Sequence, residues 1–298
     1  MQTSIPVSVS GPTSTAPSLG SRWRAELDLK LSLEGGRSVA RYRHDGPLRI
    51  LQTLYPEGGA ICHNVLVHPP GGLVGGDTLA LRVQVGEGAH GLVTTPGATR
   101  FYRSEAGAVA RQQLHADLAA GARLEWLPLE AIAYPACDAI NEARFTLAPG
   151  AELLAWDITA LGLPMAGAPF DRGRFAQHLE LSGVWLERGL IRADDELLMN
   201  GRLGLAGRRC LATLVFACGE AMAKPRQQRA LEAVRALIEA SEGGSLLAGA
   251  TAAHPQVLLL RALSDLSEPS LQLLRQCWAV WRQELWGLPA QPPRLWAM

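Results

Sequence analysis

A Gly-Ala pair recurs at residues 88, 121 and 150, each time between two segments in which apolar and polar residues alternate. The spacings between these pairs are 33 and 29 residues. Glycine accepts the positive φ of a tight corner, and alanine is small enough to pack where two strands meet. Strands that recur at nearly constant spacing cannot bury their faces singly, but stacked neighbours can. The sequence therefore predicts a mainly β fold, a stacked two-stranded β-helix-like body, rather than an α/β fold.

Further strands are expected on both sides of these three repeats. Residues 23–31 alternate and predict a first strand, and residues 47–67 predict two more around a Gly-rich turn. A looser fourth copy of the repeat covers residues 175–181, with Ser182-Gly183 as its corner. Residues 1–20 are rich in Ser, Thr, Pro and Gly and carry no charged side chain, which predicts a disordered tail.

A glycine-rich stretch precedes the first repeat, with the sequence His68-Pro69-Pro70-Gly71-Gly72-Leu73-Val74-Gly75-Gly76-Asp77. It could be mistaken for a phosphate-binding loop. It lacks the Gly-Lys-Ser/Thr ending of such loops, and the alternating residues 78–85 predict a strand after it where a phosphate loop requires a helix. We interpret it as a tight corner between strands.

The chain changes character after a β-rich body at residues 21–223. Residues 225–238 predict a helix with proline in its first turn and Leu231, Val234 and Ile238 on one face. A short helix is expected near residues 255–266, and a longer one opens at Pro269. We therefore expect residues 224–298 to form a helical region packed on the same domain.

Composition excludes several classes of partner. Lys+Arg and Asp+Glu both number 28, so the formal charge is zero and neither a nucleic acid nor an anionic membrane surface is indicated as a partner. The chain has 5 scattered cysteines, which is typical of reduced thiols in a cytosol. No secretory signal or membrane-spanning stretch is recognisable, so a cytoplasmic location is expected.

Three side chains could bind a metal. Cys62, His63 and His68 are soft and borderline ligands close together in sequence, and in principle they suit nickel, zinc or copper. Nothing nearby completes a set of four ligands, and the alternative is a buried thiol with hydrogen-bonded histidines. Cys210 and Cys218 frame an apolar run and are expected to be core thiols.

Catalytic motifs are missing from the sequence: it contains neither Gly-x-Ser-x-Gly nor His-Glu-x-x-His. One alternative is a β-helical carbohydrate-active enzyme that uses Glu130 and Asp157 as its carboxylate pair. A seam of apolar residues in the last helix has the composition of a partner-binding surface, although such a seam is more often part of an internal core. The residues of that surface would be Arg275, Trp278, Trp281 and Arg282.

Several blocks together closely resemble the urease accessory protein D family, which is called H in some bacteria. They follow one another over most of residues 23–296: the glycine-rich stretch at 68–77, Thr94-Thr95-Pro96-Gly97-Ala98-Thr99-Arg100-Phe101-Tyr102-Arg103-Ser104, Leu124-Glu125-Trp126-Leu127-Pro128-Leu129-Glu130-Ala131-Ile132, Trp156-Asp157 and Pro293-Arg294-Leu295-Trp296. One departure stands out. Many members carry Gly-Arg-Pro-x-x-Gly-Glu-x-Phe, whereas this chain has Leu163 and Ala168 at the Arg and Glu positions. A contact assigned to those two positions is in doubt here.

The resemblance implies a non-enzymatic maturation factor with a stacked β fold and C-terminal helices. Such proteins work with the accessory proteins F and G on apo-urease, and they are thought to pass nickel through an internal polar passage, with no tightly bound cofactor. Asp77, Thr94, Glu130 and Asp157 are then candidates for the passage. Trp278 and Trp281 are candidates for contact with the F partner.

Overall fold

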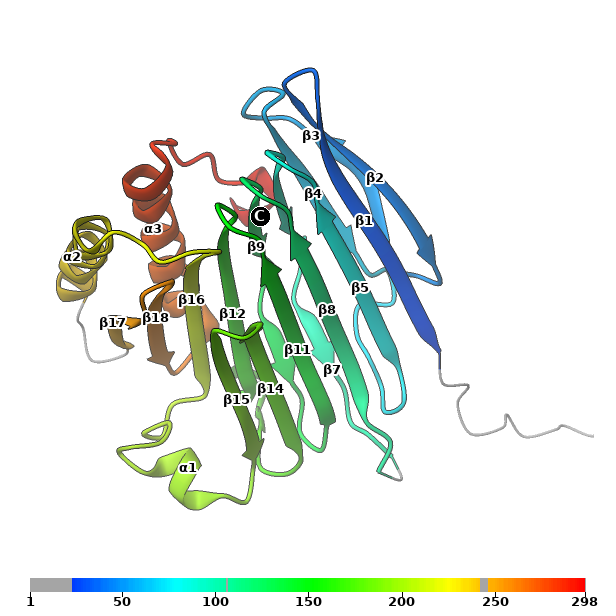
Figure 1. The fold of residues 1–298 in the computed structure, drawn as a ribbon. Helices are drawn as coiled ribbons and strands as arrows, with labels where there is room; N and C mark the ends of the chain where they lie inside the picture. The colour runs from blue at the N-terminus through cyan, green and yellow to red at the C-terminus, as the bar shows by residue number, and fades with distance from the viewer. Residues whose placement is uncertain (1–22, 106, 242–245, 298) are drawn as a thin grey trace, which may run out of the picture.

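The fold has three layers, two β-sheets and a pair of helices (Figure 1). The computed structural model describes residues 23–297, apart from residue 106 and residues 242–245. The predicted disordered tail at residues 1–20 lies outside this range. Among the described residues, no helix is long and apolar enough to cross a bilayer.

The first layer, sheet A, has seven strands in the order β15-β14-β11-β8-β5-β1-β2. Its strands are β1 (Arg24–Glu34), β2 (Arg37–Asp45), β5 (Thr78–Val85), β8 (Ala110–Leu118), β11 (Asp138–Leu147), β14 (Arg174–Leu181) and β15 (Trp185–Arg192).

The second layer, sheet B, follows the order β17-β18-β16-β12-β9-β6-β4-β3. Its strands are β3 (Arg49–Leu54), β4 (Ile61–Val67), β6 (His90–Thr94), β9 (Arg123–Leu127), β12 (Glu152–Leu163), β16 (Cys210–Cys218), β17 (Leu246–His254) and β18 (Val257–Ser264), with the short β7 (Thr99–Phe101), β10 (Ala131–Ala133) and β13 (Ala168–Pro169) beside them.

The helices complete the molecule. Helices α2 (Lys224–Ser241) and α3 (Ser267–Trp286) form the third layer against sheet B, as Figure 1 shows. The short helix α1 (Glu196–Asn200) lies between β15 and β16, and the 3₁₀ turns η1 (Pro164–Ala166) and η2 (Arg294–Ala297) follow β12 and end the described chain. The helices predicted at residues 225–238 and from Pro269 are confirmed.

Each Gly-Ala corner carries the chain from sheet A to sheet B, as the repeats predict. The glycines at 88, 121 and 150 have φ of 65°, 66° and 75°, and the alanine after each is fully buried. Neighbouring corners are joined by backbone hydrogen bonds, such as Arg123 N to the Ala89 carbonyl at 2.9 Å. Strands β5, β8, β11 and β14 pair in parallel, as do β4, β6, β9 and β12. The stacked β-helix-like prediction is confirmed.

Two predictions differ from the structure. The fourth repeat does not cross to sheet B, because Ser182-Gly183 turns β14 into an antiparallel hairpin with β15 at the edge of sheet A. The short helix predicted near residues 255–266 is wrong, since β18 occupies Val257–Ser264. Residues 257–260 of β18 are apolar on both faces because sheet B is covered on both sides there, and such an unbroken apolar run does not distinguish a strand from a helix.

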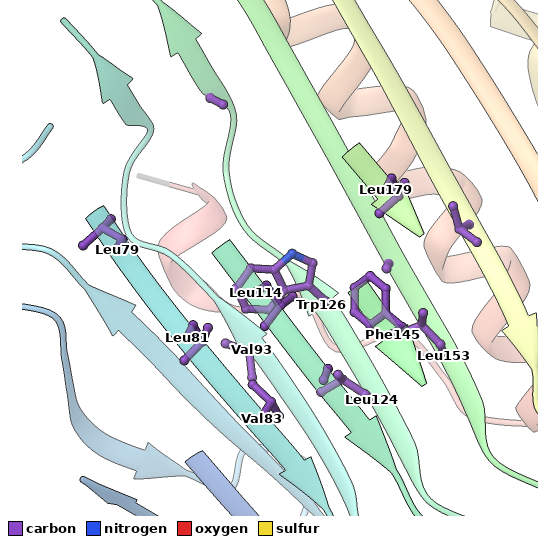
Figure 2. Close-up of a cluster of buried hydrophobic side chains, with 14 of the residues drawn as sticks. Leu79, Leu81, Val83, Val93, Leu114, Leu124, Trp126, Phe145, Leu153 and Leu179 are labelled. Atoms are coloured by element: carbon purple, nitrogen blue, oxygen red, sulfur yellow. The ribbon is translucent and has the colours of Figure 1, made fainter. Parts of the chain in front are cut away.

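Sheet B separates two hydrophobic cores. The first lies between the sheets, where Leu81, Leu114, Trp126 and Phe145 meet (Figure 2). The second lies under the helices and includes Trp156, Phe216, Trp278 and Trp281. Cys210 and Cys218 are buried in this second core, which confirms them as core thiols.

The glycine-rich stretch before β5 is a close-packed corner. A Cβ on Gly72 would lie 2.3 Å from Tyr102 Cε2 and 2.8 Å from the Arg100 carbonyl oxygen, so this loop fits only against a bare backbone. The buried Asp77 accepts a hydrogen bond from Val74 N at 2.9 Å and closes the turn. The stretch is therefore a structural corner, as its sequence indicates.

Substitution of Gly72 by alanine tests this packing. We expect Gly72→Ala to lower the free energy of unfolding by about 1–3 kcal/mol, because Tyr102 and the 100–102 backbone must shift. Gly97→Ala is the matched control, since a Cβ there meets nothing within 4 Å. Urea unfolding of both variants gives the measurement, and equal stability of the two would contradict the packing argument.

Candidate functional site

Three amide side chains form a row across sheet A. Gln112 pairs in register with Asn141, and Asn141 with Gln177, so the three lie side by side at right angles to the strands. All three point between the sheets, although their strands otherwise send apolar side chains such as Leu114 and Leu179 into that space. Amides inside an apolar core need hydrogen-bond partners, so their presence calls for an explanation.

A second polar row lies across sheet B. Asp157 pairs in register with Thr213, which pairs with Arg261. These residues face sheet A: Asp157 contacts Asn141, and Arg261 contacts Glu187 of β15. The two rows therefore meet between the sheets.

Hydrogen bonds connect the rows into a chain of side chains that we call the inter-sheet polar line. Gln112 Nε2 donates to Asn141 Oδ1 at 3.1 Å, and Asn141 Nδ2 donates to Asp157 Oδ1 at 3.2 Å. Gln177 donates to Asp157 Oδ2 and, at 3.5 Å, to the hydroxyl of Thr159. These bonds, together with one from Thr99 to Gln112, link Thr99, Gln112, Asn141, Asp157, Gln177 and Thr159. Thr213 and Glu187 complete the line as a separate hydrogen-bonded pair, with Thr213 beside Asp157 in the register of β12 and β16.

The inter-sheet polar line joins two hollows. At one end, Thr99 and Gln112 line a cavity of about 180 Å³ between the sheets, together with His68 and Trp126. At the other end, Glu187 and Thr213 line a cleft of about 390 Å³ beside β17 and β18. Polar side chains thus cross the inter-sheet core from one hollow to the other.

Asp157 is the acidic centre of the line. Removal from water raises the pKa of Asp157 to about 6, and the nearby charge of Glu187 adds to the rise, while hydrogen bonds from Gln177 and Asn141 act against it. Amide, hydroxyl and carboxylate oxygens are hard ligands. Supplied one or two at a time, they hold a divalent cation only weakly, so the line suits an ion that moves on.

The other passage candidates do not join this line. Asp77 closes the glycine-rich turn. Thr94 faces the helices and accepts a hydrogen bond from Trp296 Nε1 at 3.0 Å, and Glu130 lies beside Ser267 at the start of α3. Of the four, Asp157 is the one that hydrogen-bonds within the line. Because Glu130 meets α3 while Asp157 meets sheet A, sheet B also separates the carboxylate pair considered for carbohydrate chemistry.

The three candidate metal ligands do not converge. Cys62 faces the inter-sheet core, and burial raises the pKa of its thiol to about 11. His63 faces the helices, with its Nε2 2.7 Å from Glu57 Oε1. His68 lines the smaller cavity, and burial lowers its pKa against the opposing charge of Asp77. In the described part of the chain, no three His, Cys, Asp or Glu side chains are placed to hold a metal.

The expected partner-binding seam is internal. Trp278, Trp281 and Arg282 are 1%, 0% and 0% exposed, so they cannot form a docking surface in this conformation. Arg275 stacks on the Trp296 ring at 5.2 Å and is partly buried. The seam is apolar because α3 packs on sheet B, which is the alternative that the sequence left open.

Arg282 belongs to a closed charged cluster between α3 and sheet B. Its Nη2 donates to Glu57 Oε2 at 2.7 Å, and its Nε lies 3.6 Å from Glu125 Oε2. Glu125 also accepts from Trp278 Nε1 at 2.6 Å and lies 2.9 Å from His90 Nε2. Burial alone would raise the pKa of Glu57, but hydrogen bonds from His63 and Arg282 outweigh it and lower that pKa. The cluster fixes α3 to the sheet.

Leu163 and Ala168, the departure from the family pattern, are cross-strand neighbours. They pair in register in the β12–β13 hairpin, and Gly162 beside them has a φ of 76°. An Arg and a Glu at these positions would face each other as an ion pair. In this chain both positions are apolar, and the hairpin is formed.

Sequence reasoning missed Gln112, Asn141, Gln177 and Glu187. A signal for two of them was present, because Gln112 and Asn141 each stand nine residues before the glycine of a Gly-Ala corner, at an inward position of the repeat. Aligning the repeats on their corners would have placed these amides in one row. Gln177 and Glu187 belong to the hairpin that breaks the repeat, so no such alignment reaches them.

The fold and the site define a stacked β protein with a polar line through its core and no recognisable catalytic set among the described residues. The profile of the family described as "UreD urease accessory protein" matches residues 24–297. The chain is 62% identical over 276 residues to the urease accessory protein UreD of Paracidovorax citrulli, covering 93% of this chain and 99% of that protein. The identity is 58% to the UreD of Albidiferax ferrireducens, again covering 93% and 99%. The chain therefore belongs to the UreD family of urease accessory proteins, which confirms the resemblance.

Replacement of Asp157 by asparagine should change how stability depends on pH. The pKa of about 6 in the folded chain exceeds the ordinary 3.8, so folding favours the protonated acid, and this stabilisation is lost as pH rises through 6. Asp157→Asn should therefore be more stable than the wild type at pH 8, by up to about 3 kcal/mol, and equal to it near pH 4. Urea unfolding across this pH range is the measurement, with the exposed Asp28→Asn as control. A difference independent of pH would contradict the assignment.

Arg282 provides a second test, of the charged cluster. Arg282→Leu leaves Glu57 and Glu125 buried without their cation, so we expect a loss of about 3–5 kcal/mol in the free energy of unfolding. Gln283→Ala, an exposed change on the same helix, should stay within about 0.5 kcal/mol. Similar losses in the two variants would show that the cluster does not hold α3.

Proposed function

We propose that this protein is a non-enzymatic factor in urease maturation that conducts nickel along the inter-sheet polar line. It would act in the cytoplasm with the accessory proteins F and G on apo-urease, and nickel would be cargo in transit with no cofactor held tightly. The observation that carries this proposal is the run of oxygen-bearing side chains between the cavity and the cleft. It is hydrogen-bonded from Thr99 to Asp157 and continues to the Thr213–Glu187 pair through the register of β12 and β16.

The ligand chemistry of the line supports transport over storage. A closed set of cysteine and histidine ligands would trap nickel, whereas single carboxylate and amide oxygens release it. Two thiols, Cys62 and Cys137, belong to the inter-sheet core, and burial raises their pKa values to about 11 and about 12. Cys62 donates to the His90 carbonyl oxygen at 3.6 Å, and Cys137 donates to the Arg174 carbonyl oxygen at 3.7 Å. They therefore offer little thiolate to a passing ion.

We propose that the F partner binds the helical layer. The buried tryptophans cannot contact that partner directly. Because Trp278 and Trp281 face sheet B, contact would use the outward faces of the two helices, where Glu232 and Gln283 are exposed. The tryptophans would then hold the helices in place from the buried side of this surface.

Complementation of a deletion strain tests the function. In a urease-positive host that lacks this gene, we expect urease activity to be lost even with nickel in excess and restored by the wild-type gene. Gln177→Leu keeps a similar side-chain volume but removes the hydrogen bond that Gln177 donates to Asp157. Loss of one buried donor should lower the restored urease activity about tenfold.

Gln84→Leu is the matched control, since Gln84 lies on the exposed outer face of sheet A. It should restore activity fully. Normal nickel loading in the deletion strain would refute the maturation role, and full activity of a folded Gln177→Leu variant would refute the route.

A further inference from the structure

Strand β15 leaves one edge of sheet A unpaired. It pairs with β14 on one side in an unbroken register, and no other backbone segment of the described chain bonds to residues 186–191. The strand has 8 residues and contains no proline. An unpaired edge of this kind presents a row of N–H and C=O groups, to which another extended chain can pair.

The edge strands at the other ends of the two sheets are protected. On β17, Arg235 donates from Nε and Nη2 to the Ala250 carbonyl oxygen at 3.1 Å and 2.9 Å. On β2, Ser38 N already donates to the Gly59 carbonyl oxygen at 2.9 Å. A register shift interrupts β3. Capped backbone groups and irregularities of this kind discourage further pairing, and β15 has neither.

The outward side chains of β15 define what an added strand must carry. Glu187 and Ile191 point between the sheets, so the alternate residues Leu186, Arg188 and Leu190 lie on the outer face. The two leucines are 49% and 52% exposed. None of the ion pairs among the described residues includes Arg188. A neighbouring strand would therefore pair best with an acidic side chain opposite Arg188 and apolar side chains on either side of it.

Sheet B continues past this edge and forms a floor beside it. Strand β15 lies over β18, where Glu187 contacts Arg261, whereas β17 extends beyond sheet A (Figure 1). Leu247 of β17 is 50% exposed, and it lines the cleft of about 390 Å³ together with Leu211 and Leu263. Because Glu187 and Arg261 neutralise each other, this floor suits uncharged apolar side chains.

The same floor excludes a second copy of this chain as the occupant. Each copy carries β18 and β17 past its own β15, so two copies joined at this edge would overlap beneath it. A single extended segment avoids this overlap, because one added strand needs only about 4.8 Å of width. The space beside β15 therefore fits a lone strand and not the edge of another sandwich.

We propose that β15 and the adjoining floor are a docking site for an extended segment of a partner protein, which adds to the edge of sheet A as a further strand. The segment places apolar side chains on the floor, and on its other face it carries an acid opposite Arg188. Backbone hydrogen bonds to β15 supply affinity, and the alternate side chains supply specificity. The site itself does not depend on the proposed function, but the choice of probes below rests on it.

Peptide binding to the purified full chain tests the site. The probes are overlapping peptides of about 12 residues, longer than a typical strand, that cover the sequences of apo-urease and of the accessory proteins F and G. They are screened on an array, and the Kd of each binder is then measured by fluorescence anisotropy. We expect at least one peptide with the alternating pattern to bind and to slow amide hydrogen exchange at residues 186–190.

Substitutions on the outer face make the test specific. Arg188→Glu places a like charge opposite the acid, so the Kd should rise about fivefold, and a peptide with lysine in place of the acid should recover most of this loss. The double variant Leu186→Lys with Leu190→Lys should raise the Kd about tenfold. Arg43→Glu is the matched control, because it makes the same charge change at an exposed position of β2, at the far side of sheet A. Its Kd should stay within about twofold of the wild type.

Several results would overturn the proposal. These are the absence of any binding peptide, binding that leaves exchange at residues 186–190 unchanged, and binding that Arg188→Glu does not weaken. Slow exchange at these residues before any peptide is added would show that the chain itself covers the edge. Self-association that the double leucine variant abolishes would assign the edge to a second copy. None of these outcomes bears on the proposed function, which fails if the deletion strain loads nickel normally.

Discussion

The register of the stacked strands is the constraint on which the rest of this structure depends. Each Gly-Ala corner bonds to the next through its backbone, so successive turns of the chain are held in fixed alignment. Because side chains in aligned parallel strands repeat at the same height, the inward positions of β8, β11 and β14 fall in one row. Three amides occupy that row. The polar line is thus a product of repeat geometry as much as of the individual side chains.

Sheet B keeps two kinds of buried polar structure apart. On its helix face, Arg282 and two glutamates form a compact charged cluster joined by ion pairs, which suits a permanent attachment. On its other face the groups are mostly neutral amides and hydroxyls around Asp157, extended between two hollows. The first arrangement fixes a helix, and the second leaves oxygen atoms available to a guest.

The sequence was a good guide where local signals and tertiary structure agree. The corners at 88, 121 and 150 predict the stacked body because a glycine with positive φ followed by a small residue is typical of a tight corner between strands. Prediction failed at β18, because its residues 257–260 are all buried and lack the alternation that distinguishes a strand from a helix. Asp157 was found among the candidates, but Thr94, at the end of the strand that follows the first Gly-Ala corner, serves the opposite face. The side of a sheet that a polar residue faces is set by register, which depends on distant strands.

Strand β12 shows how strongly strand register constrains this protein. Asp157 belongs to the polar line, while Trp156 beside it packs against Trp296 under the helices. A one-residue slip of β12 would exchange the two faces, burying an acid among tryptophans and placing an indole in the inter-sheet polar line. Insertions or deletions within this strand should therefore be far less tolerated than substitutions. The register of β12, more than the identity of any residue in it, preserves both the attachment of the helices and the polar line between the sheets.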